Sequence, residues 1–206
     1  MKILDTVLDF QVEPIQNIIE KAKHATPKQT VFYGDSLIQG FSLAHYFPNV
    51  CLYNCGVNGA TSALLLQLGD DAIGAYQPKE AFILIGTNDL GRRYCCSVGE
   101  IVKNVQILLE QFWLRYALEK VYIISPLPII EKSKAEGIRN NHSLKSLGKS
   151  LQAVTHEKLQ LQYIDVYDAF LDDQKGMDQQ YTEDGLHLNA KGYAILSEHL
   201  RPYIEK

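Results

Sequence analysis

The chain has 206 residues, of which 46% are hydrophobic and 21% are charged, an ordinary composition for a globular domain with one buried core. The formal net charge of -4 at pH 7 gives no basic surface of the kind that nucleic-acid-binding proteins carry, so no nucleic-acid partner is expected. No apolar run reaches a membrane-spanning length, and the N-terminus lacks the apolar core of a secretory signal. The sequence therefore predicts a cytoplasmic protein without stable membrane insertion.

The first segment, residues 1–28, is predicted to be an amphipathic helix that ends near Pro27. We interpret it as an N-terminal helical extension of a single domain that covers residues 1–206. The sequence does not determine what this helix packs against. The helix could cover the body of its own chain, or it could join a second copy in a homodimer, and the oligomeric state cannot be derived from the sequence.

Five short runs that follow this segment are almost continuously apolar, which is typical of parallel strands buried on both faces. They are "TVFY" (30–33), "VCLYN" (50–54), "AFILIG" (81–86), "VYIISP" (121–126) and "LQYIDV" (161–166). Helical patterns separate them, and the last one, "NAKGYAILSEHLRPYI", begins after Asn189 as a predicted N-cap. The alternation predicts a three-layer α/β/α sandwich with a five-stranded parallel sheet in the flavodoxin-like order 2-1-3-4-5.

Polar motifs stand where these strands end. "GDSL" (34–37) follows the first strand and carries Ser36, "NCGVNGAT" (54–61) follows the second and carries Gly56 and Gly59, and "GTND" (86–89) follows the third and carries Asn88. In the predicted order the first and third strands are neighbours at the topological switch point, so Ser36 and Asn88 would face one crevice. Near the C-terminus, "DGLHLN" places Asp184 three residues before His187.

Each motif also has a purely structural interpretation. A serine or aspartate after a strand often caps the next helix, and a glycine there often makes a turn. The occurrence of all four motifs at related edges of one sheet favours a site, because a hydroxyl, donor groups and an Asp-His pair are together what nucleophilic catalysis requires.

The four motifs resemble, in order, the blocks of the SGNH or GDSL hydrolase superfamily of serine esterases, lipases, thioesterases and carbohydrate deacetylases. The resemblance covers residues 30 to 200 and is greatest to the branch similar to platelet-activating-factor acetylhydrolase. It implies that Ser36 is the nucleophile, His187 the general base and Asp184 the group that orients the imidazole. It also implies an oxyanion hole made by the backbone N–H groups of Ser36 and Gly56 and by the Asn88 side chain. Asp35 is expected to hold the turn.

The predicted substrate is a small acyl ester, because the segments between the motifs look too short for a lid. Arg92 could attract an anionic head group, or it could be a solvated loop residue, and Leu127 and Ile129 could line an acyl pocket. A thioesterase or lysophospholipase for longer chains, and a catalytically inactive binding module, are the alternatives. Neither a metal nor another cofactor is expected, since the four cysteines show no zinc-site spacing with histidines.

Overall fold

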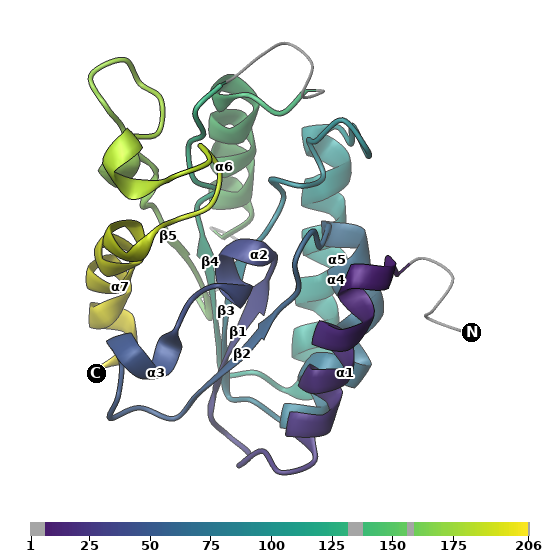
Figure 1. The fold of residues 1–206 in the computed structure, drawn as a ribbon. Helices are drawn as coiled ribbons and strands as arrows, with labels where there is room; N and C mark the ends of the chain where they lie inside the picture. The colour runs from purple at the N-terminus through teal and green to yellow at the C-terminus, as the bar shows by residue number, and fades with distance from the viewer. Residues whose placement is uncertain (1–6, 132–137, 156–158, 206) are drawn as a thin grey trace.

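The computed structural model describes residues 7–131, 138–155 and 159–205. Five strands form one parallel sheet in the order β2-β1-β3-β4-β5, which confirms the predicted fold (Figure 1). The strands are β1 (Thr30–Gly34), β2 (Leu52–Gly56), β3 (Glu80–Leu84), β4 (Lys120–Ile124) and β5 (Leu161–Ile164). They coincide with the five apolar runs because a strand buried on both faces cannot alternate between apolar and polar residues.

Two layers of helices cover the sheet. One face carries α1 (Asp9–Ala22), α4 (Ser62–Leu68), α5 (Val98–Tyr116) and α6 (Asn141–Thr155), and the other carries α2 (Ser36–Gln39), α3 (Leu43–Tyr46) and α7 (Ala190–Ile204) (Figure 1). Short 3₁₀ turns lie at Gly74–Tyr76, Tyr167–Phe170 and Gln179–Tyr181, and a π-helical turn lies at Gly69–Ile73. Each face of the sheet has its own hydrophobic core: the first core lies under α1, α4, α5 and α6, and the second lies under α2, α3 and α7. Along β1, Val31 and Tyr33 point into the first core and Phe32 points into the second.

The N-terminal helix is shorter than predicted. α1 ends at Ala22 rather than near Pro27, because the N–H groups of Lys23, His24 and Ala25 bond to carbonyls three residues back and tighten the last turn. Residues 1–6 of the predicted helix lie outside the described residues. The apolar face of α1 packs on the first core of its own chain through Ile15, Ile18 and Ala22.

The three neighbouring strands β2, β1 and β3 end at the same level. Gly34 of β1 is in register with Gly56 of β2 and with Leu84 of β3. The segments that follow these strands therefore begin side by side at one edge of the sheet. Within the ranges that the structure describes, no helix combines the length and apolarity that crossing a bilayer requires.

Candidate active site

Ser36 is the first residue of α2, directly after β1. Asp35 is the N-cap of this helix, and its Oδ1 accepts a hydrogen bond from the Leu37 N–H at 2.9 Å, which confirms that Asp35 holds the turn. Gly34 is required by close packing, since a Cβ there would lie 2.2 Å from the Leu84 carbonyl oxygen. The turn thus presents the Ser36 side chain, which is partly exposed, at the carboxyl edge of the sheet.

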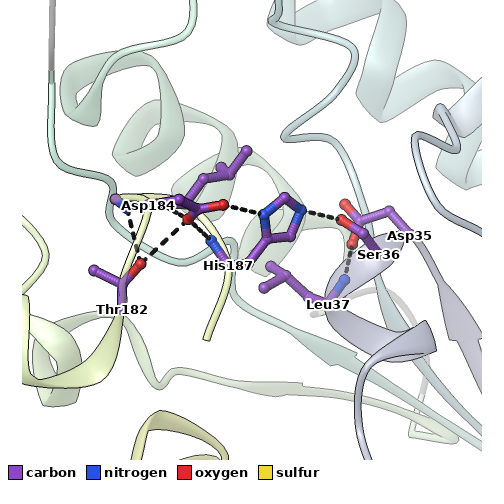
Figure 2. A network of polar contacts seen from close by, with 8 residues as sticks. Asp35, Ser36, Leu37, Thr182, Asp184 and His187 are labelled. Atoms are coloured by element: carbon purple, nitrogen blue, oxygen red, sulfur yellow. Dashed lines mark hydrogen bonds and ion pairs between the residues drawn. The ribbon is translucent and has the colours of Figure 1, made fainter. Parts of the chain in front are cut away.

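His187 and Asp184 complete a continuous polar chain with this serine (Figure 2). The distance from His187 Nε2 to Ser36 Oγ is 3.0 Å, and the distance from His187 Nδ1 to Asp184 Oδ2 is 2.6 Å. With the Nδ1 proton directed at the carboxylate, Nε2 is left to accept the serine proton. This is the geometry of a nucleophile, a base and a group that orients the base.

The environment of Asp184 favours its ionised form. Burial acts to raise the pKa of Asp184, but hydrogen bonds from the His187 ring and from the His187 and Leu186 backbone N–H groups outweigh it and hold that pKa well below its usual range. A carboxylate that stays charged can stabilise the imidazolium that forms when His187 takes a proton.

Hydrogen bonds from backbone N–H groups hold the loop that carries Asp184 and His187. The Gly185 N–H donates to Thr182 Oγ1 at 2.9 Å, and the Ile130 N–H donates to the Gly185 carbonyl at 2.8 Å. Asn189 caps α7, as predicted, by accepting from the Gly192 N–H. These bonds fix the position of His187 relative to α7 and to the segment after β4.

Asn88 lies after β3 and faces the loop that follows β2. One Nδ2 hydrogen of Asn88 donates to the Ala60 carbonyl at 3.0 Å, so the second hydrogen of the amide is left for a ligand. The neighbouring Asp89 is buried and accepts from the Ser62 N–H and hydroxyl at the start of α4. Burial raises the pKa of Asp89. Both residues therefore hold the β2–α4 loop against the end of β3.

Gly56 does not fit its predicted role. Its N–H donates to Asn54 Oδ1 at 2.9 Å, so this donor is already occupied. The glycine is needed for another reason, because a Cβ at Gly56 would lie 2.1 Å from the Gln39 backbone nitrogen in α2. Close packing of β2 against α2, and not an oxyanion contact, explains Gly56 in this structure.

Gly59 is the better candidate for a backbone donor in this loop. It is partly accessible, its φ is 68°, and its N–H makes no hydrogen bond among the described residues. The residue occupies the third position of a turn closed by the Ala60 N–H and the Val57 carbonyl at 3.0 Å. The "NG" dipeptide at 58–59 is the sequence signal that could have identified it, because such a turn needs a residue with positive φ at this position.

The three predicted substrate contacts lie in different environments. Arg92 is exposed on the β3–α5 loop. Leu127 and Ile129 are each only 2% exposed and belong to the two opposite cores. The segment after β4 continues the packing of the strand, so its apolar side chains point into the protein, and we do not propose Leu127 and Ile129 as substrate contacts. In the parts of the chain that the structure describes, no three His, Cys, Asp or Glu side chains are grouped to hold a metal ion.

Comparison with known proteins identifies the family. The model of the GDSL-like lipase/acylhydrolase family matches residues 32–195, whereas no curated protein sequence matches significantly. A structure from Streptococcus pneumonia, provisionally described as a platelet activating factor, is 28% identical with a TM-score of 0.83 over 95% of each chain.

Two further structures share less sequence. One, provisionally described as an acylhydrolase from Bacteroides fragilis NCTC 9343, is 19% identical, with a TM-score of 0.83 over 97% of this chain and 98% of its own. The other, an acetyl xylan esterase, is 16% identical, with a TM-score of 0.70 over 85% of this chain and 99% of its own. These two show the fold alone. The family match spans most of the chain, so this protein is an enzyme that belongs to the GDSL-like lipase/acylhydrolase family.

Proposed function

We propose that this acylhydrolase cleaves small, acetyl-like carboxylic esters with Ser36 as nucleophile, His187 as general base and Asp184 as the residue that orients His187. The observation that carries the proposal is the unbroken chain of contacts at 3.0 Å and 2.6 Å from the serine hydroxyl through the imidazole to the carboxylate. A serine hydroxyl is a weak nucleophile until a base removes its proton.

The reaction has two balanced steps. Ser36 Oγ attacks the ester carbonyl carbon while its proton passes to His187 Nε2, and the alcohol then leaves with that proton. This leaves an acyl group on Ser36. Water attacks the acyl group with His187 as base, and the carboxylic acid is released with regeneration of the serine.

The negative charge that develops on the carbonyl oxygen needs preorganised donors. We assign this role to the Ser36 N–H at the start of α2, the Asn88 amide and the Gly59 N–H. The assignment of Gly59 replaces that of Gly56, whose N–H is occupied by Asn54. Donors directed at a charge that exists only in the transition state lower the barrier without tightening substrate binding.

A short acyl group is favoured by what surrounds the triad. The cavity of about 360 Å³ beside His187 is lined by Glu183, Asp184, Asn189 and their neighbours in the same segment. Ser36 is not among its lining residues, so this cavity does not define the acyl site. Leu127 and Ile129, the apolar side chains that the sequence predicts for an acyl pocket, are enclosed in the cores. An acetyl group needs little apolar surface, whereas a long chain would need a lined tunnel.

A series of p-nitrophenyl esters from two to ten acyl carbons tests the chain length. A tunnel would contribute about 0.8 kcal/mol for each buried methylene, so kcat/KM would climb several-fold per carbon. We expect instead a series that is flat or falls beyond about four carbons, with no turnover by Ser36→Ala. A steady climb through eight and ten carbons would replace the proposal with a thioesterase or lysophospholipase for longer chains.

A further inference from the structure

The peptide group between Asn58 and Gly59 is held from the N-terminal helix. Gln11 in the first turn of α1 is only 1% exposed, and its Nε2 donates to the Asn58 carbonyl at 2.9 Å across a separation of 47 residues. Its Oε1 accepts from the Leu8 N–H at 3.0 Å, which caps α1. A buried side-chain amide thus connects α1 directly to the loop that carries Gly59.

This contact fixes the direction of the Gly59 N–H. In a trans peptide the C=O and the N–H of one peptide group point in opposite directions, so a carbonyl directed at Gln11 forces the Gly59 N–H away from α1. The turn has a positive φ of 68° at Gly59 and a bond from the Ala60 N–H to the Val57 carbonyl, the pattern of a type II turn. A type I turn would keep the same closing bond but would reverse the central peptide. The Gly59 N–H can therefore point in either of two opposite directions, one in the type II turn and the other in the type I turn.

The flanking peptides of the turn are held by other residues. The Asn58 N–H donates to Gln39 Oε1 of α2, and the Ala60 carbonyl accepts from the Asn88 side chain. Phe10 covers the outer side of Gly59, since a Cβ at that glycine would lie 3.2 Å from the Phe10 ring. Among these side-chain bonds, the one from Gln11 is made to the central peptide, the unit whose reversal would turn the Gly59 N–H around.

We propose that Gln11 is a positioning residue for catalysis: it selects the turn state in which the Gly59 N–H points at the developing oxyanion. The proposal rests on the proposed function, because it takes the Gly59 N–H as an oxyanion donor. A hydrogen bond to the carbonyl also polarises the peptide and strengthens its N–H as a donor. The N-terminal helix thereby preorganises the active site from a distance.

The first test is Gln11→Met, which keeps the approximate volume of the side chain and removes its donor. We expect kcat for p-nitrophenyl acetate to fall by about tenfold to 100-fold, with KM changed less than about threefold, because deleting an oxyanion donor outright costs about 100- to 1,000-fold. Rates are expressed per active site titrated with an organophosphate, so that loss of folded protein does not enter kcat.

The second variant, Gln11→Glu, separates positioning from packing. The carboxyl group can keep the cap on Leu8, and when protonated it can still donate to the Asn58 carbonyl. When ionised it would repel that carbonyl and favour the reversed peptide. Burial raises the pKa of a carboxyl group, so the ratio of variant to wild-type kcat should fall as pH rises through that pKa. The wild-type protein is measured at the same pH values, so pH effects that both proteins share cancel in the ratio.

The matched control is Ile18→Ala. Ile18 lies on the buried face of the same helix, and it is 5% exposed in the wild type. This substitution should lower the Tm at least as much as Gln11→Met but leave kcat within about twofold. Equal losses of kcat in Gln11→Met and Ile18→Ala would overturn the role of Gln11. A ratio of Gln11→Glu to wild-type kcat that does not change with pH would overturn it as well. Normal turnover by Ser36→Ala would instead overturn the proposed function, so the two failures are distinguishable.

Discussion

At the scale of single residues, the structure separates N–H groups that are free to act as the proposed oxyanion donors from N–H groups that are already bonded within the described chain. Gly56 and Gly59 stand three positions apart in one glycine-containing loop, but the Gly56 N–H is bonded to Asn54 and the Gly59 N–H is not bonded within the described chain. Asn88 has one amide hydrogen on Ala60 and one to offer. The proposed donor set therefore rests on which amide hydrogen atoms are still available for a ligand.

Replacement of Asn88 by alanine tests this donor set. The change should lower kcat by about 100- to 1,000-fold and leave KM nearly unchanged, because the amide would meet full negative charge only in the tetrahedral state. Steady-state kinetics on p-nitrophenyl acetate provide the measurement. The β2–α4 loop also loses its bond to Asn88 in this variant, because the Ala60 carbonyl accepts from the same amide, so the Tm is measured beside kcat to register any loosening of the loop. A rise in KM at constant kcat would make Asn88 a substrate-binding residue instead.

At the scale of elements, short α2 depends on a buried cap that carries a titratable group. Asp35 is enclosed, no cationic side chain among the described residues is hydrogen-bonded to it, and burial raises its pKa to about 7. In the unfolded chain an aspartate titrates near about 3.9. Between about pH 4 and pH 7 the folded state therefore keeps a proton that the unfolded state has lost, so this group makes stability fall as pH rises.

The variant Asp35→Asn tests that linkage. Asparagine also caps helices through its side-chain oxygen and does not ionise. The Tm of the variant minus that of the wild type should therefore increase from pH 4 to pH 8. Asp184 acts in a different window, because its lowered pKa gives stability that is lost only as pH falls below the ordinary aspartate range. A Tm difference that stays constant or shrinks with rising pH would contradict the buried, protonated state of Asp35.

The elements also show what sequence patterns can and cannot predict. The five strands and the Asn189 cap were predictable because they depend on local apolar runs and on a local capping bond. The burial of Leu127 and Ile129 was not, since it depends on packing between distant elements. The hydrogen bond from Gln11 to the Asn58 carbonyl was not predictable either, because the two residues lie 47 positions apart in the chain. The loop after β2 was predicted as a donor site, but its pattern could not show which N–H was occupied.

At the scale of the whole molecule, four separate segments converge on one edge of the sheet. The turn after β1 presents Ser36, the loop before α7 presents His187 and Asp184, and the loops after β2 and β3 face each other through Ala60 and Asn88. The equal level at which β1, β2 and β3 end explains why the segments that follow these three strands meet. On the other side of the β2–α4 loop, α1 contributes Gln11 and so connects the N-terminal segment to the same edge.

Whether Ser36 is the nucleophile of an ester hydrolase is tested by the kcat of Ser36→Ala on p-nitrophenyl acetate. The side chain is small, partly exposed and not part of a core, so the variant should fold with a Tm close to that of the wild type. We expect a loss in kcat on the order of 1,000-fold or more, because the Ser36 hydroxyl is the proposed source of the attacking oxygen. Wild-type turnover by folded Ser36→Ala would contradict the account.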